Sequence, residues 1–409
     1  MNVMVFGIKL LACRLRKSVV NALEKIMYNL DLNQMSHNEF LNTYWQKKPV
    51  VIRQGFKNFT DPISMDEFAG IAMEETVQSR LVSKKDGQWQ AEFGPFESYE
   101  HLGDRDWSLV IQALDNFSEE AAELIEPFRF IPHWRLDDIM ASFATAGGSV
   151  GPHVDNYDVF ICQGSGKRHW RVGDKGHHAE VIAHEALLHV EPFEAIIDVE
   201  LEAGDILYIP PGYPHEGVAL EPSMSFSVGF RANSAISLLS GFADYLIDND
   251  LGSQLLEDAD RKAITNSGEI TNNDYTNIKQ QLQNLLDDDK LFKHFTGNFL
   301  TSAKHELDLM PSEEPFEHEE VSELLGIHAI KRLGGLRAFY FEDTIDEGVF
   351  YLNGEQISFD KAITPVIKML CDQLIVMPNE LAPWRDNKQF VTLMVELLDQ
   401  GYWFWTEAE

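Results

Sequence analysis

The spacing of apolar residues changes twice along this 409-residue chain. Between residues 28 and 130, helical spacing alternates with short β-rich runs. Helices are predicted at 33–45, 64–73, 107–116 and 119–128, and a strand at 50–52. From residue 131 to 231 the apolar runs are short and separated by Gly and Pro, and beyond residue 232 helical spacing returns. The pattern therefore predicts one β-rich domain flanked by mostly helical parts.

The β-rich part contains seven predicted strands joined by short turns. Closely spaced short strands are typical of an all-β sandwich or barrel, and a double-stranded β-helix (jelly roll) fits best, because its wide mouth can hold a metal and a small cosubstrate. The predicted strands are 137–145, 153–163, 167–172, 195–201, 205–209, 216–220 and 224–231.

The residues after 232 predict helices followed by a small α/β unit. Helices are expected at 237–248 and along an acidic tract at 275–309, before a proline-bearing linker. Helices with a two- or three-stranded sheet in the last hundred residues suggest a winged helix. The predicted fold class is α+β in four segments: an extension that we expect to precede the native domain (1–26), a jelly-roll domain of cupin type (27–234), a helical domain (235–311) and a winged-helix domain (312–409).

The chain carries 33 basic and 66 acidic residues, a formal charge of -33. Such a surface repels naked nucleic acid and attracts a basic partner, although acidity also serves solubility alone. Acidic residues also outnumber basic ones in the predicted winged helix, so no direct nucleic-acid binding is expected.

Cysteine usage and hydropathy place the chain in a reducing compartment away from membranes. The three cysteines, Cys13, Cys162 and Cys371, are far apart and form no CxxC pair. This argues against a disulfide framework or a thiolate zinc site, and it suits the cytoplasm. No apolar run approaches the roughly 18 residues of a membrane-spanning helix.

Two histidines and one aspartate form a candidate metal site. His153 and Asp155 stand two apart on a predicted strand, so both side chains leave the same face. His215 follows in a Pro-Pro-Gly-Tyr-Pro-His turn whose prolines and glycine would fix the backbone. Either element alone is more often structural. Together, in an all-β frame without cysteine, they match the ligands of a non-haem iron(II) oxygenase, which leaves positions open for a cosubstrate and O2.

The neighbouring strands carry further candidate residues. Arg168 can bind a carboxylate through its guanidinium fork, as 2-oxoglutarate requires, although a cross-strand ion pair is the alternative. Tyr157 shares the predicted face of His153 and Asp155. One face of the preceding strand carries Asp138, Met140, Ser142 and Ala144. Asp138 with Tyr157 could receive a guanidinium, or Asp138 could cap a turn while Tyr157 fills the core.

These residues and several longer stretches resemble the JmjC-type 2-oxoglutarate oxygenases. The branch that matches best is the bacterial ribosomal oxygenases that hydroxylate an arginine of large ribosomal subunit protein sixteen. Matching stretches include GPHVDNYDVFICQGSGKRHWRVG, EAIIDVELEAGDILYIPPGYPHEG, SFSVGFRA and KRLGGLR, and the likeness spans about residue 28 to the C-terminus. Many JmjC enzymes use a lysine for the cosubstrate, whereas the arginine in GSGKRHW is typical of this branch.

The resemblance implies a function and a set of site residues. Iron(II) would be held by His153, Asp155 and His215. 2-Oxoglutarate would be held by Arg168, with Ser142 beside it. Asp138, Met140 and Tyr157 match positions that hold the substrate arginine, which would be hydroxylated at C3 with O2 as second cosubstrate. The middle helical domain would form a homodimer. Ala144 departs from relatives that carry serine there, which leaves the cosubstrate's hydrogen-bond partners less certain.

Two other functions stay open at this point. A JmjC hydroxylase or demethylase acting on another residue or protein would keep the iron chemistry. A non-catalytic cupin-like interaction module would use the acidic surface alone, but the intact triad argues against it.

Overall fold

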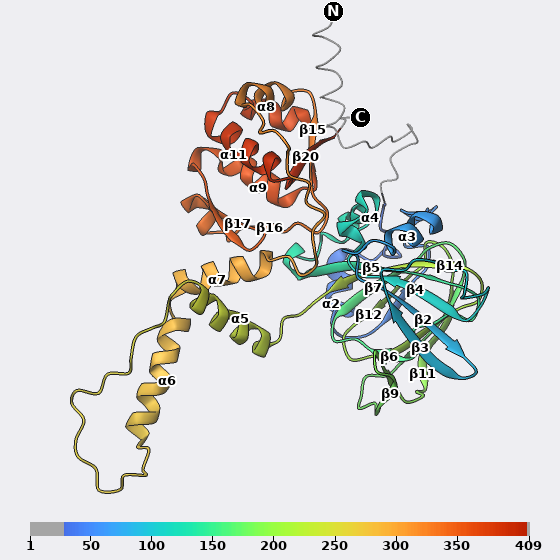
Figure 1. Ribbon diagram of the computed structural model, residues 1–409, viewed down its shortest axis with the longest axis horizontal. Helices are drawn as coiled ribbons and strands as arrows, with labels where there is room; N and C mark the ends of the chain where they lie inside the picture. Colours follow the sequence, from blue (N-terminus) through green and yellow to red (C-terminus); the bar gives the residue numbers. More distant parts are fainter. Residues whose placement is uncertain (1–27, 407–409) are drawn as a thin grey trace, which may run out of the picture. The chain divides into compact units, whose positions relative to one another are not determined.

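The computed structural model describes residues 28–406, so the predicted extension at 1–26 lies outside the described residues (Figure 1). The chain divides into two compact units. The first comprises residues up to 232 together with 303–336 and the part after 373; the second comprises 233–302 and 337–372. The predicted domain boundaries at 234/235 and 311/312 stay a prediction, because these units group the chain differently.

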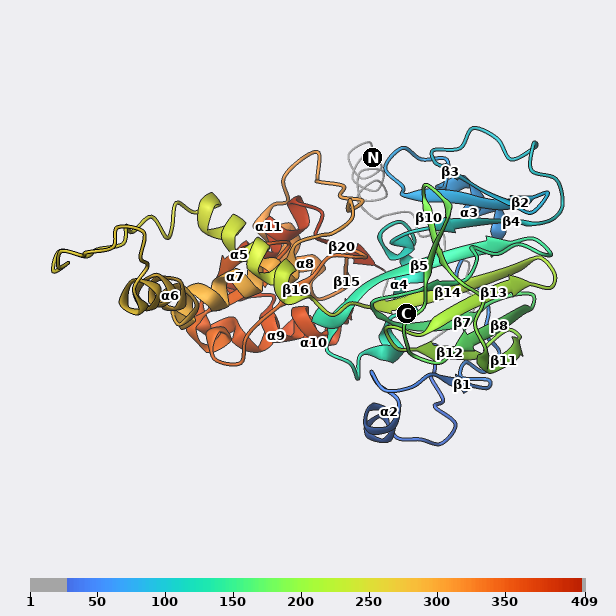
Figure 2. The ribbon, with the colours of Figure 1, turned by 90° about the horizontal axis from the view of Figure 1, so that it is seen from below.

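Two antiparallel sheets face each other in the first unit and form the predicted jelly roll (Figure 2). The larger sheet has the order β1 (Val50–Ile52), β12 (Ile206–Ile209), β7 (Asp158–Gln163), β14 (Ser223–Phe230), β5 (Leu136–Ala144), β4 (Trp107–Ile111), β2 (Ser79–Lys85), β3 (Gln88–Phe93). The smaller sheet has the order β11 (Ala195–Leu201), β8 (Arg168–Gly173), β13 (Pro214–Ala219), β6 (His153–Val154), with a separate hairpin of β9 (Glu180–His184) and β10 (Leu187–Val190).

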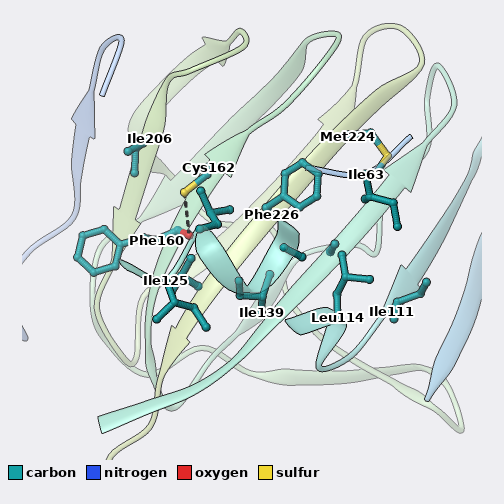
Figure 3. Packing of buried hydrophobic residues seen from close by; sticks show 14 of the residues in the cluster. Ile63, Ile111, Leu114, Ile125, Ile139, Phe160, Cys162, Ile206, Met224 and Phe226 are labelled. Atoms are coloured by element: carbon teal, nitrogen blue, oxygen red, sulfur yellow. Dashed lines mark hydrogen bonds between the residues drawn. The ribbon is translucent and has the colours of Figure 1, made fainter. Parts of the chain in front are cut away.

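The larger sheet is apolar on its outer face and polar in part on its inner face. On β5, Ile139 and Ala141 join the main hydrophobic cluster, whereas Asp138, Met140 and Ser142 alternate with them and point the other way. Figure 3 shows Phe160, Cys162 and Phe226 packed in this cluster beside Ile139. Side chains from α2 (His37–Thr43), α3 (Met65–Ile71) and α4 (Glu119–Glu123) belong to the same cluster, so the main core lies on the outer side of the larger sheet. A second buried cluster lies between the two sheets, with residues of β7 and β12 packed against Trp170 and Val172 of β8, so only the part of the inner face toward β5 is left for a site.

Local sequence signals explain where the N-terminal helices start. Ser36 with Glu39 and Ser64 with Glu67 form capping boxes at the starts of α2 and α3. The predicted helix at 107–116 is wrong. Its first half is the buried strand β4 between β2 and β5, followed by a 3-10 turn, Leu114–Asn116. A short apolar run cannot be assigned by periodicity alone, and here pairing with two neighbouring strands decides the outcome.

The predicted strand at 153–163 is two strands in different sheets. β6 ends at Val154 and pairs with β13, whereas β7 begins at Asp158 and pairs with β12 and β14. The chain therefore crosses from one sheet to the other between these residues. This break places Asp155 and Tyr157 in a connection at the mouth of the sandwich.

The later residues of the first unit form helices around a three-stranded sheet. The sheet order is β19 (Ile375–Val376), β15 (Ala329–Arg332), β20 (Trp403–Thr406), with α8 (His318–Leu324), α10 (Pro378–Leu381) and α11 (Lys388–Asp399). Buried Lys331 on β15 pairs with Glu119 and Glu123 of α4 at 3.3 and 3.2 Å, which ties this sheet to the jelly roll.

The second unit contains three helices and a small sheet. The helices α5 (Ala235–Asp248), α6 (Asn272–Leu286) and α7 (Asp289–Thr301) precede the sheet β16 (Ala338–Phe339), β17 (Val349–Leu352), β18 (Glu355–Ser358) and the helix α9 (Thr364–Asp372). The acidic tract predicted as one helix is thus two helices, because Asp288 caps a new one. Within the described residues, no helix is long and apolar enough to cross a membrane.

Candidate metal and cosubstrate site

The structure brings the three predicted metal ligands together at the mouth of the jelly roll. Asp155 Oδ2 lies 3.5 Å from His215 Nε2 and 3.9 Å from His153 Nε2. The two imidazole rings are 4.3 Å apart, and one ligand atom from each residue lies within 4.8 Å of the others. Among the described residues, this is the one cluster of His, Cys, Asp and Glu side chains close enough to hold a metal ion.

Strand pairing and tight turns create this geometry. His153 on β6 is the direct cross-strand partner of His215 on β13, so both rings leave the same face. The sequence placed His215 in a turn, whereas it is the second residue of β13. The backbone N–H of Gly212 donates to the carbonyl oxygen of Asp155 at 2.9 Å, which fixes the third ligand. Gly212 has φ +87°, a conformation that favours glycine.

Both histidines are oriented by hydrogen bonds on the side away from the cluster. The Nδ1 atoms of His153 and His215 lie 2.9 and 3.0 Å from the carbonyl oxygens of Gly151 and Tyr213. A carbonyl accepts only, so each Nδ1 donates and each Nε2 keeps its lone pair for a metal. Burial, followed by the nearby His153, lowers the pKa of His215 to about 4, so the ring is neutral as a ligand must be. Two imidazoles and a carboxylate without thiolate fit iron(II).

Arg168 on β8 is a buried cation whose partners among the described residues are neutral. Within residues 28–406 its guanidinium donates to Ser142 Oγ at 2.8 Å, Ser142 O at 2.9 Å, Ser223 Oγ at 2.9 Å and Ser223 O at 3.0 Å. Burial lowers the pKa of Arg168 to about 9. A cation buried among neutral oxygens is costly unless an anion reaches it, so this position suits a carboxylate ligand.

Ser142 therefore positions Arg168, and a residue missed by the sequence reasoning does the same. Ser223 lies opposite Ala144 across the β14–β5 pair, where it supplies a hydroxyl to the guanidinium. No signal in the sequence links Ser223 to Arg168, because 55 residues separate them.

The predicted substrate residues line the inner face of β5 and the connection after β6. Asp138 is buried, and its Oδ2 accepts from the backbone N–H of Ala113 at 2.9 Å. Burial, followed by the charge of Asp137, raises the pKa of Asp138. Met140 accepts a hydrogen bond through sulfur from Gln112 at 3.5 Å. Burial raises the pKa of the Tyr157 phenol, and the charge of Asp155 raises it further, which places Tyr157 beside the metal cluster.

Arg80 is a second residue that the sequence reasoning missed. Its cross-strand partner on β4 is Val110, which in turn pairs with Ser142, so Arg80 shares the inner face of the sheet. Its charge interacts with Tyr157 and Asp155, and its buried Nε has no hydrogen-bond partner in the described part of the chain. Arg80 thus adds a positive charge to the mouth of the site.

Comparisons with known proteins agree with this geometry. Residues 123–238 match the JmjC domain, and residues 284–404 match the ROXA-like winged helix. The chain is 45% identical over 378 residues to the ribosomal protein uL16 3-hydroxylase of Escherichia coli, covering 92% of this chain and 99% of that protein. The chain belongs to the JmjC ribosomal oxygenase family.

Other relatives extend the comparison. A probable ribosomal oxygenase of Haemophilus influenzae is 32% identical, covering 81% of this chain and 85% of its own. A solved structure of YcfD, a ribosomal oxygenase from Escherichia coli in complex with cobalt and 2-oxoglutarate, has a TM-score of 0.84 at 44% identity and covers 92% of this chain and 99% of its own. The predicted jelly roll and winged helix are therefore confirmed for this family member.

Proposed function

We propose that this chain is an iron(II)- and 2-oxoglutarate-dependent oxygenase that hydroxylates C3 of an arginine residue in the ribosomal protein uL16. The observation that carries the proposal is a His-Asp-His cluster in the same sandwich as Arg168, a buried cation whose described partners are all neutral. A relative that is 45% identical is the ribosomal protein uL16 3-hydroxylase of Escherichia coli, and a related structure holds cobalt with 2-oxoglutarate. Both support the same chemistry here.

Different residues of the site would bind the metal and the cosubstrate. His153, Asp155 and His215 would hold iron(II), which with 2-oxoglutarate and O2 supplies the oxidant for inserting oxygen into a C–H bond. Arg168, fixed by Ser142 and Ser223, would bind the carboxylate of 2-oxoglutarate remote from the metal. The main contribution of these residues to the rate would then be to orient the oxidant and the target C–H bond toward each other.

In this proposal the target arginine is recognised by one negative charge and by apolar contacts with its side chain. Asp138 would accept hydrogen bonds from the guanidinium, and Tyr157 and Met140 would contact the side chain's carbons. The formal charge of -33 favours encounter with a basic ribosomal protein and disfavours naked nucleic acid.

Mass spectrometry of uL16 from cells with and without the gene tests the proposal. A +16 Da arginine should be present with the wild-type gene, absent without it, and absent again when the gene carries His153→Ala. A +16 Da histidine, or loss of a lysine methyl group, would instead support the alternative JmjC activities. An unchanged spectrum in all three strains would refute enzymatic action on uL16.

We also propose that the helical domain forms a homodimer in the cytoplasm. The second unit exposes large apolar side chains on α5 and α6 that a partner copy would cover; they include Ile236, Leu239, Ile247, Ile278 and Leu282. Light scattering of the full chain tests the proposal: the wild type should have twice the mass of the chain, and Leu282→Asp should yield monomers that still bind 2-oxoglutarate. A monomeric wild type would contradict it.

A further inference from the structure

The segment 303–306, which follows α7, is fixed against the end of β5 that carries Asp137 and Asp138. Lys304 Nζ donates to Asp137 Oδ1 at 2.8 Å, and Asn116 Nδ2 donates to the carbonyl oxygen of Glu306 at 2.9 Å. Two attachments on either side of residue 305 hold its backbone in place. The segment lies within the part of the chain that matches the ROXA-like winged helix, outside the JmjC match.

The imidazole of His305 faces the carboxylate of Asp138. Its Nε2 lies 3.9 Å from Asp138 Oδ2, within the range of an ion pair but longer than a hydrogen bond. Its Nδ1 is buried and has no hydrogen-bond partner among the described residues. A buried ring nitrogen without a partner is costly, so the placement of this ring requires an explanation beyond packing.

Among the described residues, His305 is the basic side chain that lies within 4.0 Å of the Asp138 carboxylate. The neighbouring Asp137 is already paired with two cations, Arg231 at 2.8 Å and Lys304 at 2.8 Å. Asp138 Oδ2 accepts from the backbone N–H of Ala113, whereas Oδ1 faces Gly229, where a Cβ would lie 3.5 Å from it in ordinary van der Waals contact. Within the described residues no hydrogen bond reaches Oδ1, so this oxygen is the one left to accept from a substrate.

We propose that His305 is a positioning residue of the substrate pocket, which holds Asp138 Oδ2 so that Oδ1 receives the guanidinium of the target arginine. The inference rests on the proposed role of Asp138 in binding arginine. It means that the pocket is completed by a residue from outside the jelly roll. A carboxylate already fixed on one oxygen loses less conformational freedom when the substrate arrives.

The test measures binding of purified uL16 to the full-length, metal-free protein by fluorescence anisotropy. His305→Ala should weaken the affinity by up to about fivefold, the effect of losing one close ion-pair contact. His305→Gln should stay within about twofold of wild type, because its amide N–H reaches the position of Nε2. In steady-state assays of the iron-loaded enzyme, His305→Ala should raise the KM for uL16 and leave the KM for 2-oxoglutarate unchanged.

Lys304→Met is the matched control, since it removes the adjacent cation whose partner is Asp137 and leaves the imidazole. A loss with Lys304→Met as large as that with His305→Ala would assign the effect to placement of the segment and overturn the proposal. Wild-type affinity in His305→Ala would also overturn it. Asp138→Asn distinguishes failure of the proposed arginine pocket from failure of the role of His305. If Asp138→Asn binds uL16 as tightly as wild type does, the proposed arginine pocket is refuted. If Asp138→Asn binds uL16 weakly while His305→Ala binds it normally, only the role of His305 is refuted.

Discussion

Arg168 offers the sharpest test of the site, because its loss should separate stability from function. The change is Arg168→Met, which keeps most of the side-chain volume and removes a buried charge. The wild-type guanidinium makes four hydrogen bonds, all to oxygens of Ser142 and Ser223. A buried charge without an anionic partner, as Arg168 is among the described residues, is costly, so its removal offsets the loss of the four hydrogen bonds. The free energy of unfolding should therefore change by less than about 2 kcal/mol in either direction.

Binding of 2-oxoglutarate should respond quite differently. A bidentate, charge-assisted pair in a buried site contributes about 3 kcal/mol or more, so the dissociation constant should rise by at least about 100-fold. At a concentration of 100 times the wild-type dissociation constant, 2-oxoglutarate should stabilise the cobalt-loaded wild type by about 2.7 kcal/mol, and at the same concentration this increment should fall to about 0.4 kcal/mol or less in Arg168→Met.

Two measurements decide the outcome, both on the cobalt-loaded protein. Calorimetric titration gives the affinity for 2-oxoglutarate, and chemical unfolding with and without 2-oxoglutarate gives the stability increment. The matched control is Ser223→Ala, which removes one of the four hydrogen bonds and should weaken binding by about tenfold at most. An affinity in Arg168→Met within about threefold of wild type would refute the assignment of the carboxylate to this guanidinium.

Three further predictions concern the metal ligands and the core. His153→Ala should lower the affinity for cobalt by at least about 100-fold in calorimetry, because two ligands remain of three; retention of wild-type affinity would place the metal elsewhere. The pKa of His215 is lowered to about 4 in the folded protein. The metal-free protein should therefore lose up to about 3 kcal/mol as pH falls from about 6.5 to 4, and His215→Gln should flatten that part of its unfolding profile. Phe160→Ala, at 0% exposure, should destabilise the chain by about 3–5 kcal/mol in urea unfolding, whereas Phe93→Ala, at 65% exposure, should change stability by less than about 0.5 kcal/mol.

The metal cluster was predictable from the sequence because its parts carry strong local signals. A His-x-Asp pair at a strand end and a histidine in a turn rich in Pro and Gly limit the possible geometry before any fold is known. Even so, the reasoning from a continuous strand was incomplete, since the strand breaks after Val154. Tyr157 lies near Asp155 because the connection crosses between the two sheets, and not because both residues share a strand face.

The rest of the site depends on contacts between distant parts of the chain, which no local pattern encodes. Ser223 reaches Arg168 only through the register of β14 with β5, and Arg80 faces the inner side only because β2 continues the sheet beyond β4. The same cause explains the wrong helix at 107–116: pairing on both sides makes Trp107–Ile111 a strand whatever its propensity. His305 is the extreme case, since 167 residues separate it from Asp138. The proposed substrate pocket, assembled in this way, would tie recognition of the target arginine to correct folding of the chain that follows α7, and not to the jelly roll alone.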